Sequence, residues 1–379
     1  MILSIYILDF VLMVCYPGVP TSQSEIKSRA SIAQKFNMPF DARTKLEVVQ
    51  DQRANGNPLY LSMGACHFIP KGEQVPSAVV PLAGLSDVNT LLCNEGGSYV
   101  TYHSDRYGFR NPDQAWTKDN VDVALLGDSF AQGCCVTDKQ EMGSLLRKMG
   151  YSVINLGLAG NGPLVELASI IEYAGSVHPK NVFWMYFEGN DFRNLKKEKT
   201  CRILSGYLEK GYAQNLISRQ PEIDRILKGF VDNRELKEKT IKKRKTFKPT
   251  RILKLKDLRV HLANIVEDPQ CEDEIDPIFE RILTRARDVV SSWGGNLYFV
   301  YLPQFRRYYY LRTSAADFCN KEAVLSLVHR MRIPVIDMDL VFARESDPLS
   351  LFPFRIKGHY TGFGYSLVAQ SIHQSVAGR

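Results

Sequence analysis

Four short blocks of this 379-residue chain carry the residue types that nucleophilic acyl transfer requires. They are Gly127-Asp128-Ser129, residues 157–160, Gly189-Asn190-Asp191 and His359. A serine hydroxyl becomes a useful nucleophile when a base takes its proton, and histidine is the usual base. The backbone N–H of Ser129 and the side-chain amide of Asn190 are suitable donors to a developing oxyanion. We therefore expect Ser129 to be the nucleophile of an acyl-transfer site.

Each block also has an ordinary structural interpretation. Serine often caps a helix, asparagine and aspartate often form turns, and a glycine-rich stretch is often only a turn. The glycines of residues 157–162 are spaced G-x-x-G-x-G with no phosphate-binding lysine after them, which argues against a nucleotide site. The functional interpretation requires the four blocks to lie close together in the fold. We expect Gly127, Asp128, Gly189 and Asp191 to form the turns that hold the reactive side chains in place.

From residue 121 onward, short apolar runs alternate with helical patterns. The apolar runs cover residues 121–126, 152–156, 181–187, 296–302 and 334–338, and the helical patterns cover 139–149, 163–177, 274–293, 320–331 and 363–376. Runs that are apolar on both faces and spaced by helices are typical of buried parallel strands. We predict an α/β fold, a three-layer α/β/α sandwich with a five-stranded, mainly parallel, flavodoxin-like sheet. Ligands of such sheets bind beyond the carboxyl ends of the strands, where the blocks lie.

The sequence divides into three parts. Residues 1–17 are a candidate anchor or signal segment, residues 18–120 a linker and an irregular extension packing on the core, and residues 121–379 the α/β/α domain. Residues 2–15 are apolar with one acid, but they are short for a spanning helix and no basic flank precedes them. We expect a membrane-anchored or exported protein of the cell envelope. A buried N-terminal helix and a cytoplasmic location are the alternative.

The third and fourth predicted strands are separated by about 80 residues more than a normal crossover needs. We predict a mostly helical insertion at about 195–273, either a lid or substrate platform over the site or a packing appendage. Within it, Lys237 to Arg259 hold eleven Lys or Arg against two acids, whereas the whole chain has a net charge of +7. This basic segment could bind an anionic polymer or a membrane surface, or it could be a solvated helix. Nucleic acid is not an expected partner.

Cysteine and histidine usage argues against a structural metal centre. None of the eight cysteines forms a C-x-x-C pair, and the seven histidines do not cluster with them. The cysteine density is too low for a disulfide scaffold, although individual bridges are compatible with export. Serine-based acyl transfer requires no metal or organic cofactor, and we expect none.

In their order and at these element ends, the four blocks resemble the SGNH (GDSL-like) hydrolase superfamily, over roughly residues 100–195 and the last 30 or so. The resemblance implies that Ser129 is the nucleophile and His359 the general base. It also implies an oxyanion hole formed by the N–H groups of Ser129 and Gly160 and the side chain of Asn190. The lead-in segment Tyr107 to Asn111 is similar to that of a bacterial subgroup associated with cell-surface polysaccharide metabolism.

One position departs from the family pattern. An aspartate usually lies two or three residues before the histidine, where this chain has Lys357 and Ile356. That acid orients the imidazole and stabilises its charged form. A backbone carbonyl could replace it, or one of three acids that are near in sequence, Asp347, Asp337 and Asp339. Otherwise a Ser–His pair acts alone, or the scaffold persists for binding without catalysis.

Three functions are compatible with these observations. The first is a serine ester hydrolase that removes a small acyl group, acetyl for example, from a carbohydrate or related ester through an acyl-enzyme on Ser129. The second is an O-acyltransferase that passes the same acyl group to a polysaccharide hydroxyl. Transfer is favoured over hydrolysis when the site excludes water from the acyl-enzyme. The third is a non-catalytic glycan-binding or assembly protein. The substrate class follows from the family resemblance alone.

Overall fold

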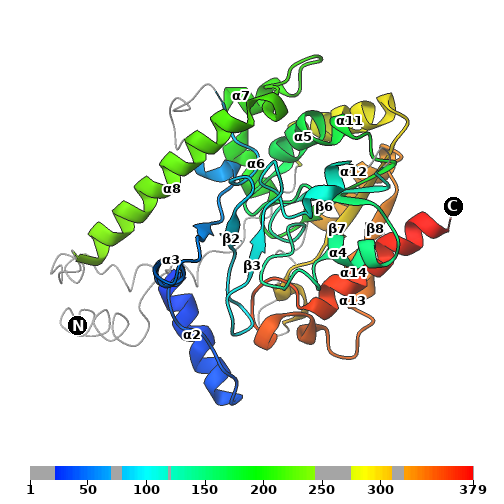
Figure 1. Ribbon diagram of the computed structural model, residues 1–379. Coiled ribbons are helices and arrows are strands. Elements are labelled where there is room, and N and C mark those ends of the chain that lie inside the picture. The colour runs from blue at the N-terminus through cyan, green and yellow to red at the C-terminus, as the bar shows by residue number, and fades with distance from the viewer. Residues whose placement is uncertain (1–21, 70–78, 118–120, 244–274, 310–319, 379) are drawn as a thin grey trace, which may run out of the picture.

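The computed structural model describes residues 22–69, 79–117, 121–243, 275–309 and 320–378 (Figure 1). Within these ranges no helix combines the length and the apolar character that crossing a membrane requires. Residues 1–17, for which the sequence predicts an anchor or signal, lie outside the described residues, so that expectation stays a prediction.

A five-stranded sheet forms the centre of the molecule, and all of its strand pairs are parallel. The strands are β4 (Val123–Gly127), β5 (Val153–Asn155), β6 (Asn181–Phe187), β7 (Asn296–Leu302) and β8 (Val335–Asp337). Their order across the sheet is β5-β4-β6-β7-β8. Every residue of β4 and β6 is buried, which explains why these strands are continuous apolar runs in the sequence. The predicted α/β/α fold is confirmed.

Helices cover both faces of this sheet. On one face pack α5 (Pro163–Glu172), α11 (Pro277–Ser292) and α12 (Asn320–Arg330), and on the other pack α4 (Met142–Lys148), α13 (Met338–Phe342) and α14 (Gly362–Ala377). Because side chains alternate along a strand, β6 sends Trp184 into the first layer and Phe183 into the second. Burying an apolar side chain of this kind stabilises a fold by roughly 1.5–3 kcal/mol.

The N-terminal extension forms a small structure of its own against this core. It contains α3 (Lys45–Ala54) and the strands β1 (Tyr60–Leu61), β2 (Asn89–Leu91) and β3 (Thr101–His103). β1 pairs with β2 in parallel, and β2 pairs with β3 in antiparallel fashion. Short strands embedded in long irregular segments are what the turn-rich sequence of this region predicts.

The prediction of a linker immediately after residue 17 is wrong for residues 22–35, which form α2 (Ser22–Lys35). Over residues 26–35, only Arg29 and Ala33 are buried. A helix that buries so little leaves no apolar stripe in its sequence, and periodicity is the signal on which a helix prediction depends. The helix matters here because of Arg29, whose side chain reaches the candidate site.

The described part of the insertion is helical. It contains α6 (Asp191–Glu198), α7 (Arg202–Gly206) and α8 (Gln220–Lys243), and Figure 1 shows α8 running along one side of the molecule. Leu204 of α7 and Ile223 and Leu227 of α8 are fully buried in the same apolar cluster as α5 and α11. These contacts are those of a packing appendage.

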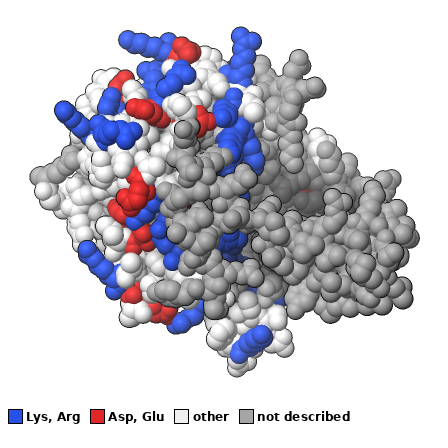
Figure 2. Space-filling view, turned by 180° about the vertical axis from the view of Figure 1, so that it is seen from behind, with Lys and Arg blue, Asp and Glu red and all other residues white. Residues whose placement is uncertain are grey.

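α8 is also tied to the N-terminal extension. Arg53 donates to Glu235 at 2.9 Å, and the rings of Phe68 and Phe230 lie 4.9 Å apart. Residues 244–274 of the insertion, which include residues 244–259 of the basic segment, lie outside the described residues, so the lid and the anionic-polymer surface stay predictions. On the face shown in Figure 2, the described surface carries both basic and acidic side chains.

Candidate active site

β4 delivers Ser129 to the carboxyl edge of the sheet through a tight turn. Gly127 has a φ of +145°, and a Cβ at this position would lie 2.8 Å from Cβ of Ala131 and 2.9 Å from Cβ of Met185. The turn therefore requires glycine. Residues 128–134 form a hydrogen-bonded turn, and the next regular helix is α4. Ser129 is not a helix cap, which was its ordinary structural interpretation.

His359 lies beside Ser129 although 230 residues separate them in sequence. Its Nε2 is 2.8 Å from Ser129 Oγ, and its Nδ1 is 3.0 Å from Oε1 of Glu95. Glu95 Oε2 accepts a second hydrogen bond from the backbone N–H of His359 at 2.7 Å. A carboxylate on Nδ1 holds the proton there, so that Nε2 is left to accept the proton of the serine. The three side chains have the geometry of a general-base-activated nucleophile.

The orienting carboxylate differs from the three acids that are near His359 in sequence. Asp347 pairs with Arg355 at 2.5 Å, and both Asp337 and Asp339 pair with Lys321, at 2.8 and 2.7 Å. These acids lie at the end of β8, in α13 and in the loop after α13, where each has its own cationic partner, and none of them contacts the imidazole. The expectation that one of them replaces the missing aspartate is therefore corrected in favour of Glu95.

Two contacts hold the Glu95 loop against the rest of the site. A disulfide joins Cys93, two residues before Glu95, to Cys135 in the turn region after Ser129. Arg29 of α2 donates to the backbone oxygen of Lys357 at 2.6 Å, and its Nη2 lies 3.6 Å from Glu95 Oε1. The disulfide thus ties the acid to the nucleophile segment, and Arg29 ties it to the histidine segment.

Candidate donors for an oxyanion lie in the loops that follow β4, β5 and β6 at the carboxyl edge of the sheet. Among the described residues, the backbone N–H groups of Ser129 and Gly160 donate to no protein acceptor. Asn190 stands at the start of α6, but its side chain makes no capping bond there. Instead, its Nδ2 donates to Asp128 Oδ2 at 3.0 Å, which leaves one amide hydrogen for a ligand. Hydrogen bonds thus connect Ser129 to His359 directly and to Asn190 through Asp128, and Gly160 lies in the loop after the neighbouring strand β5.

Asp128 connects the oxyanion donors to the nucleophile turn. Besides Asn190, it accepts the backbone N–H of Phe130 at 2.8 Å and lies 3.4 Å from Ser129 Oγ. Burial raises the pKa of Asp128, although these hydrogen bonds and the charge of His359 oppose the rise. Asp128 therefore positions the amide of Asn190.

The loop that carries Gly160 is covered by the N-terminal extension. Gly160 has a φ of +86°, and a Cβ there would lie 2.6 Å from Sγ of Cys66. Cys66 lies in a short 3₁₀ turn, Ala65–His67, and the ring of His67 packs on Phe230 of α8 at 6.1 Å. The insertion therefore supports the turn that covers the oxyanion loop. Nothing in the spacing of Cys66 indicated this placement.

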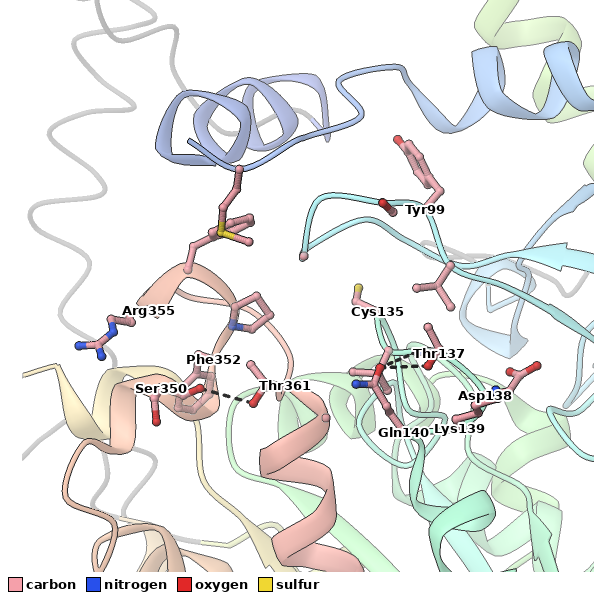
Figure 3. A pocket seen from close by; sticks show the side chains of 18 of the residues that line it. Tyr99, Cys135, Thr137, Asp138, Lys139, Gln140, Ser350, Phe352, Arg355 and Thr361 are labelled. Atoms are coloured by element: carbon pink, nitrogen blue, oxygen red, sulfur yellow. Dashed lines mark hydrogen bonds between the residues drawn. The ribbon is translucent and has the colours of Figure 1, made fainter. Parts of the chain in front are cut away.

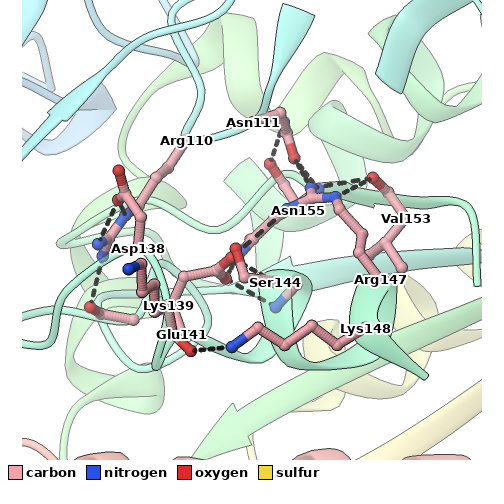
Figure 4. A network of polar contacts seen from close by, with 12 residues as sticks. Arg110, Asn111, Asp138, Lys139, Glu141, Ser144, Arg147, Lys148, Val153 and Asn155 are labelled. Carbon is pink, nitrogen blue, oxygen red and sulfur yellow. Dashed lines mark hydrogen bonds and ion pairs between the residues drawn. The ribbon is translucent and has the colours of Figure 1, made fainter. Parts of the chain in front are cut away.

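The lead-in segment 107–111 braces the loop that follows the nucleophile (Figure 4). Arg110 donates to the backbone oxygens of Gly133 and Val136 at 2.7 and 2.8 Å and pairs with Asp138. Asn155, at the end of β5, donates to the backbone oxygen of Ala131 at 2.7 Å. This buried polar network fixes the backbone on both sides of Ser129, which gives the lead-in segment a structural role.

Glu95 and His359 each stabilise the charged form of the other. Burial alone would raise the pKa of Glu95, but the charge and hydrogen bonds of His359 and the charge of Arg29 outweigh it and lower this pKa to about 2. Burial alone would lower the pKa of His359, but the charge and hydrogen bond of Glu95 and the charge of Asp128 raise it above its ordinary value. The carboxylate therefore stays ionised and stabilises the imidazolium that proton transfer creates.

Fully buried acids lie behind the oxyanion loops. Burial and neighbouring carboxylates raise the pKa of Asp191 and Glu166 well above the ordinary range, and burial raises the pKa of Glu198 to about 7. Asp191 accepts the backbone N–H of Phe187 at 2.9 Å. Groups kept neutral by burial place little negative charge behind the position of an oxyanion. The role of Asp191 is to shape the turn, and a Cβ at Gly189 would lie 2.5 Å from the ring of Phe187 in that same turn.

No protein-family model matches the chain, and no curated protein matches it. Solved structures similar to it include a lipolytic protein of the G-D-S-L family from Desulfitobacterium hafniense. The two proteins are 13% identical in sequence, and their TM-score is 0.37. The match covers 67% of this chain and 99% of that chain. A lipase/acylhydrolase from Enterococcus faecalis has 12% identity and a TM-score of 0.37 over 68% of this chain and 96% of that one. An acetyl xylan esterase has 11% identity and a TM-score of 0.37 over 68% of this chain and all of that one. The solved structures similar to this chain thus include G-D-S-L lipolytic proteins, the group that its four sequence blocks resemble.

Proposed function

We propose that this protein is a serine ester hydrolase that works through an acyl-enzyme on Ser129. The observation that carries the proposal is the unbroken chain of contacts from Glu95 through His359 to Ser129, at 3.0 and 2.8 Å. Each link has a required chemical role, and each side chain comes from a different segment of the fold. Such convergence of an acid, a base and a hydroxyl at one sheet edge is what acyl transfer needs.

The reaction begins with attack of Ser129 Oγ on the ester carbonyl carbon, while His359 Nε2 takes the hydroxyl proton. Glu95 stabilises the resulting imidazolium, and the N–H groups of Ser129 and Gly160, with the amide of Asn190, donate to the oxyanion. Collapse of the tetrahedral intermediate breaks the ester C–O bond, and His359 returns the proton to the leaving alcohol. Water then attacks the acyl-enzyme by the same proton route and releases the acid.

The substrate class proposed for this site is a small acyl group, such as acetyl, on a carbohydrate or related ester. One solved structure similar in fold is an acetyl xylan esterase. Transfer of the same acyl group to a sugar hydroxyl is the second candidate. It is favoured by the low exposure of Ser129, at 9%, because a covered acyl-enzyme hydrolyses slowly. The missing aspartate no longer favours the non-catalytic alternative, because Glu95 Oε1 lies 3.0 Å from His359 Nδ1.

A fluorophosphonate probe tests the nucleophile directly. Wild-type protein should become covalently labelled, and Ser129→Ala should not, because the probe reacts only with an activated hydroxyl. Ser144→Ala is a matched control in α4, outside the site, and should label like the wild type. Absence of labelling in the wild type would refute both the hydrolase and the transferase. Acetate release from an aryl ester, with and without an added oligosaccharide acceptor, then separates the two.

A further inference from the structure

A set of metal-ligating atoms lies on the side of His359 that faces away from Ser129. Cys135 Sγ is 3.8 Å from His359 Nδ1, and Glu95 Oε1 is 3.0 Å from the same nitrogen. The three atoms all lie within 4.8 Å of one another, although their residues come from three distant parts of the chain. Cys135 is bonded to Cys93 in this structure, so its sulfur cannot act as a thiolate ligand while the bridge is intact.

We propose that reduction of the Cys93–Cys135 disulfide uncovers a binding site for a thiophilic divalent cation such as Zn²⁺, formed by Cys135 Sγ, Glu95 Oε1 and His359 Nδ1. Thiolate, imidazole and carboxylate are the ligands that zinc takes in proteins, commonly three of them with water in the fourth position. Bond lengths of about 2.3 Å to sulfur and about 2.0–2.1 Å to nitrogen or oxygen place S and N about 3.6 Å apart in a tetrahedron, and N and O about 3.4 Å apart. The observed 3.8 and 3.0 Å need only small side-chain movements.

The charges in this cluster are compatible with a dication. A thiolate at Cys135 and the carboxylate of Glu95 together supply two negative charges, which balance those of Zn²⁺. Arg29 Nη2 lies 3.6 Å from Glu95 Oε1 and opposes binding, but it also bonds to the backbone oxygen of Lys357 at 2.6 Å. The net charge of the ligand set therefore still favours the cation.

Cys135, the sulfur ligand of the cluster, borders a cavity. A cavity of about 1000 Å³ is lined by Cys135 and by Gly96, which follows Glu95, and Thr361 and Gly362 line it beyond the histidine. Figure 3 shows Cys135 beside this cavity, between the loop of Tyr99 and the Thr361 segment. A reductant and a metal ion can therefore reach the sulfur without passing through the oxyanion side of the site.

The chemical steps balance with a dithiol as reductant. The dithiol is oxidised to its own disulfide, and the Cys93–Cys135 bridge gains two electrons and two protons to become two thiols. Metal binding releases the thiol proton of Cys135 to solvent. The imidazole proton leaves Nδ1, which coordinates the metal, and is carried on Nε2 instead. An Nε2–H donates to Ser129 Oγ and cannot accept its proton, so metal binding should inhibit acyl transfer, a consequence that rests on the proposed function.

Two single variants provide a matched test. Cys93→Ser leaves Cys135 as a thiol without any reductant, whereas Cys135→Ser removes the same bridge together with the ligand. Both retain every cysteine outside the bridge and differ only in which sulfur of the bridge remains, so a metal–sulfur bond that forms in Cys93→Ser alone is assigned to Cys135. Full-length protein is titrated with Co²⁺, whose thiolate charge-transfer absorption marks a metal–sulfur bond, and then with Zn²⁺ against a chromogenic chelator.

We expect Cys93→Ser to bind one Co²⁺ per chain with a thiolate band, and Cys135→Ser to lack the band. The Zn²⁺ affinity of Cys135→Ser should be lower than that of Cys93→Ser by at least roughly 10- to 100-fold. Loss of a residue that only hydrogen-bonds to a metal ligand already causes a reduction of this size. If the variants fail to fold during synthesis, folded wild-type protein before and after reduction by a phosphine gives the same comparison, with circular dichroism to show that the reduced protein stays folded. Equal binding by the two variants, or no band in reduced wild type, would overturn the proposal. A thiolate band in a protein without esterase activity would support the metal site and sink only the proposed function.

Discussion

Glu95→Gln is the most informative perturbation of this site. The change removes one charge and keeps the shape of the side chain, so the disulfide at Cys93 and the packing of the loop remain. The amide can still contact His359, but it no longer stabilises an imidazolium. It can also donate to Nδ1, which favours the tautomer with a proton on Nε2, the nitrogen that must accept the proton of Ser129. Both effects slow the chemical step.

The size of the effect follows from the distance between the charges. At the 3.0 Å between Glu95 Oε1 and His359 Nδ1, the interaction of two unit charges is about 5.5 kcal/mol with an effective dielectric constant of about 20. Each 1.36 kcal/mol corresponds to a factor of about ten in rate, so the ceiling is about 10⁴-fold. The amide retains part of the interaction. We therefore expect kcat to fall by about 10³- to 10⁴-fold, close to the loss seen when the acid of a catalytic triad is changed to its amide.

The assay is hydrolysis of an aryl acetate over a range of pH. Activity requires neutral His359, whose pKa is raised by Glu95, so the acid limb of the variant should also move to lower pH. Asp347→Asn is the matched control, since Asp347 pairs with Arg355 and does not contact the imidazole, and it should change kcat less than twofold or so. A Glu95→Gln enzyme within tenfold of the wild type at every pH would refute the assignment of Glu95.

Three further outcomes are expected. Asn190→Ala should lower kcat by about 10²- to 10³-fold with little change in KM, because the amide hydrogen that is not bonded to Asp128 donates to the charge that develops in the transition state. Arg29→Met should lower the free energy of unfolding by about 3 kcal/mol in urea denaturation, because it removes one of the two cationic partners of the buried Glu95 carboxylate. Arg43→Met, which breaks an exposed pair with Asp41, should have a much smaller effect. Folding lowers the pKa of Glu95 from 4.5 to about 2, so its ionised carboxylate stabilises the folded protein fully above pH 4.5. This contribution should be lost as the pH falls toward 2. The melting temperatures of the wild type and Glu95→Gln should therefore converge in acid.

The sheet and its helices could be predicted from the sequence because burial on both faces leaves an unmistakable pattern. β6 is seven consecutive buried residues, and the helical patterns after each strand match α4, α5, α11, α12 and α14 within a few residues. The α2 helix could not be predicted, since it buries only Arg29 and Ala33 over residues 26–35. The position of α2 depends on tertiary contacts to the loops of Glu95 and Lys357. Helix propensity predicts secondary structure poorly where such tertiary contacts determine it.

The candidate site shows the same division. Ser129, Gly160 and Asn190 follow strands of one parallel sheet, so topology alone places them at one edge, and the sequence order of the blocks is enough to group them. Glu95 has no such constraint. It lies 264 residues before its partner His359, in a loop outside the sheet. Such a loop has no hydrophobic periodicity from which the direction of its side chains could be predicted.

What makes an acid from this loop sufficient is the way the loop is held. A catalytic carboxylate must keep its position to within about 0.5 Å, which an irregular segment does not do unaided. In this chain the disulfide fixes the loop two residues from Glu95, Arg29 bonds to it from one side, and the backbone N–H of His359 binds the second carboxylate oxygen. These restraints replace the short spacing that normally keeps the acid beside the histidine. They also make the site depend on a bond that can be reduced, so the disulfide that fixes Glu95 is the feature through which redox conditions would act on the activity.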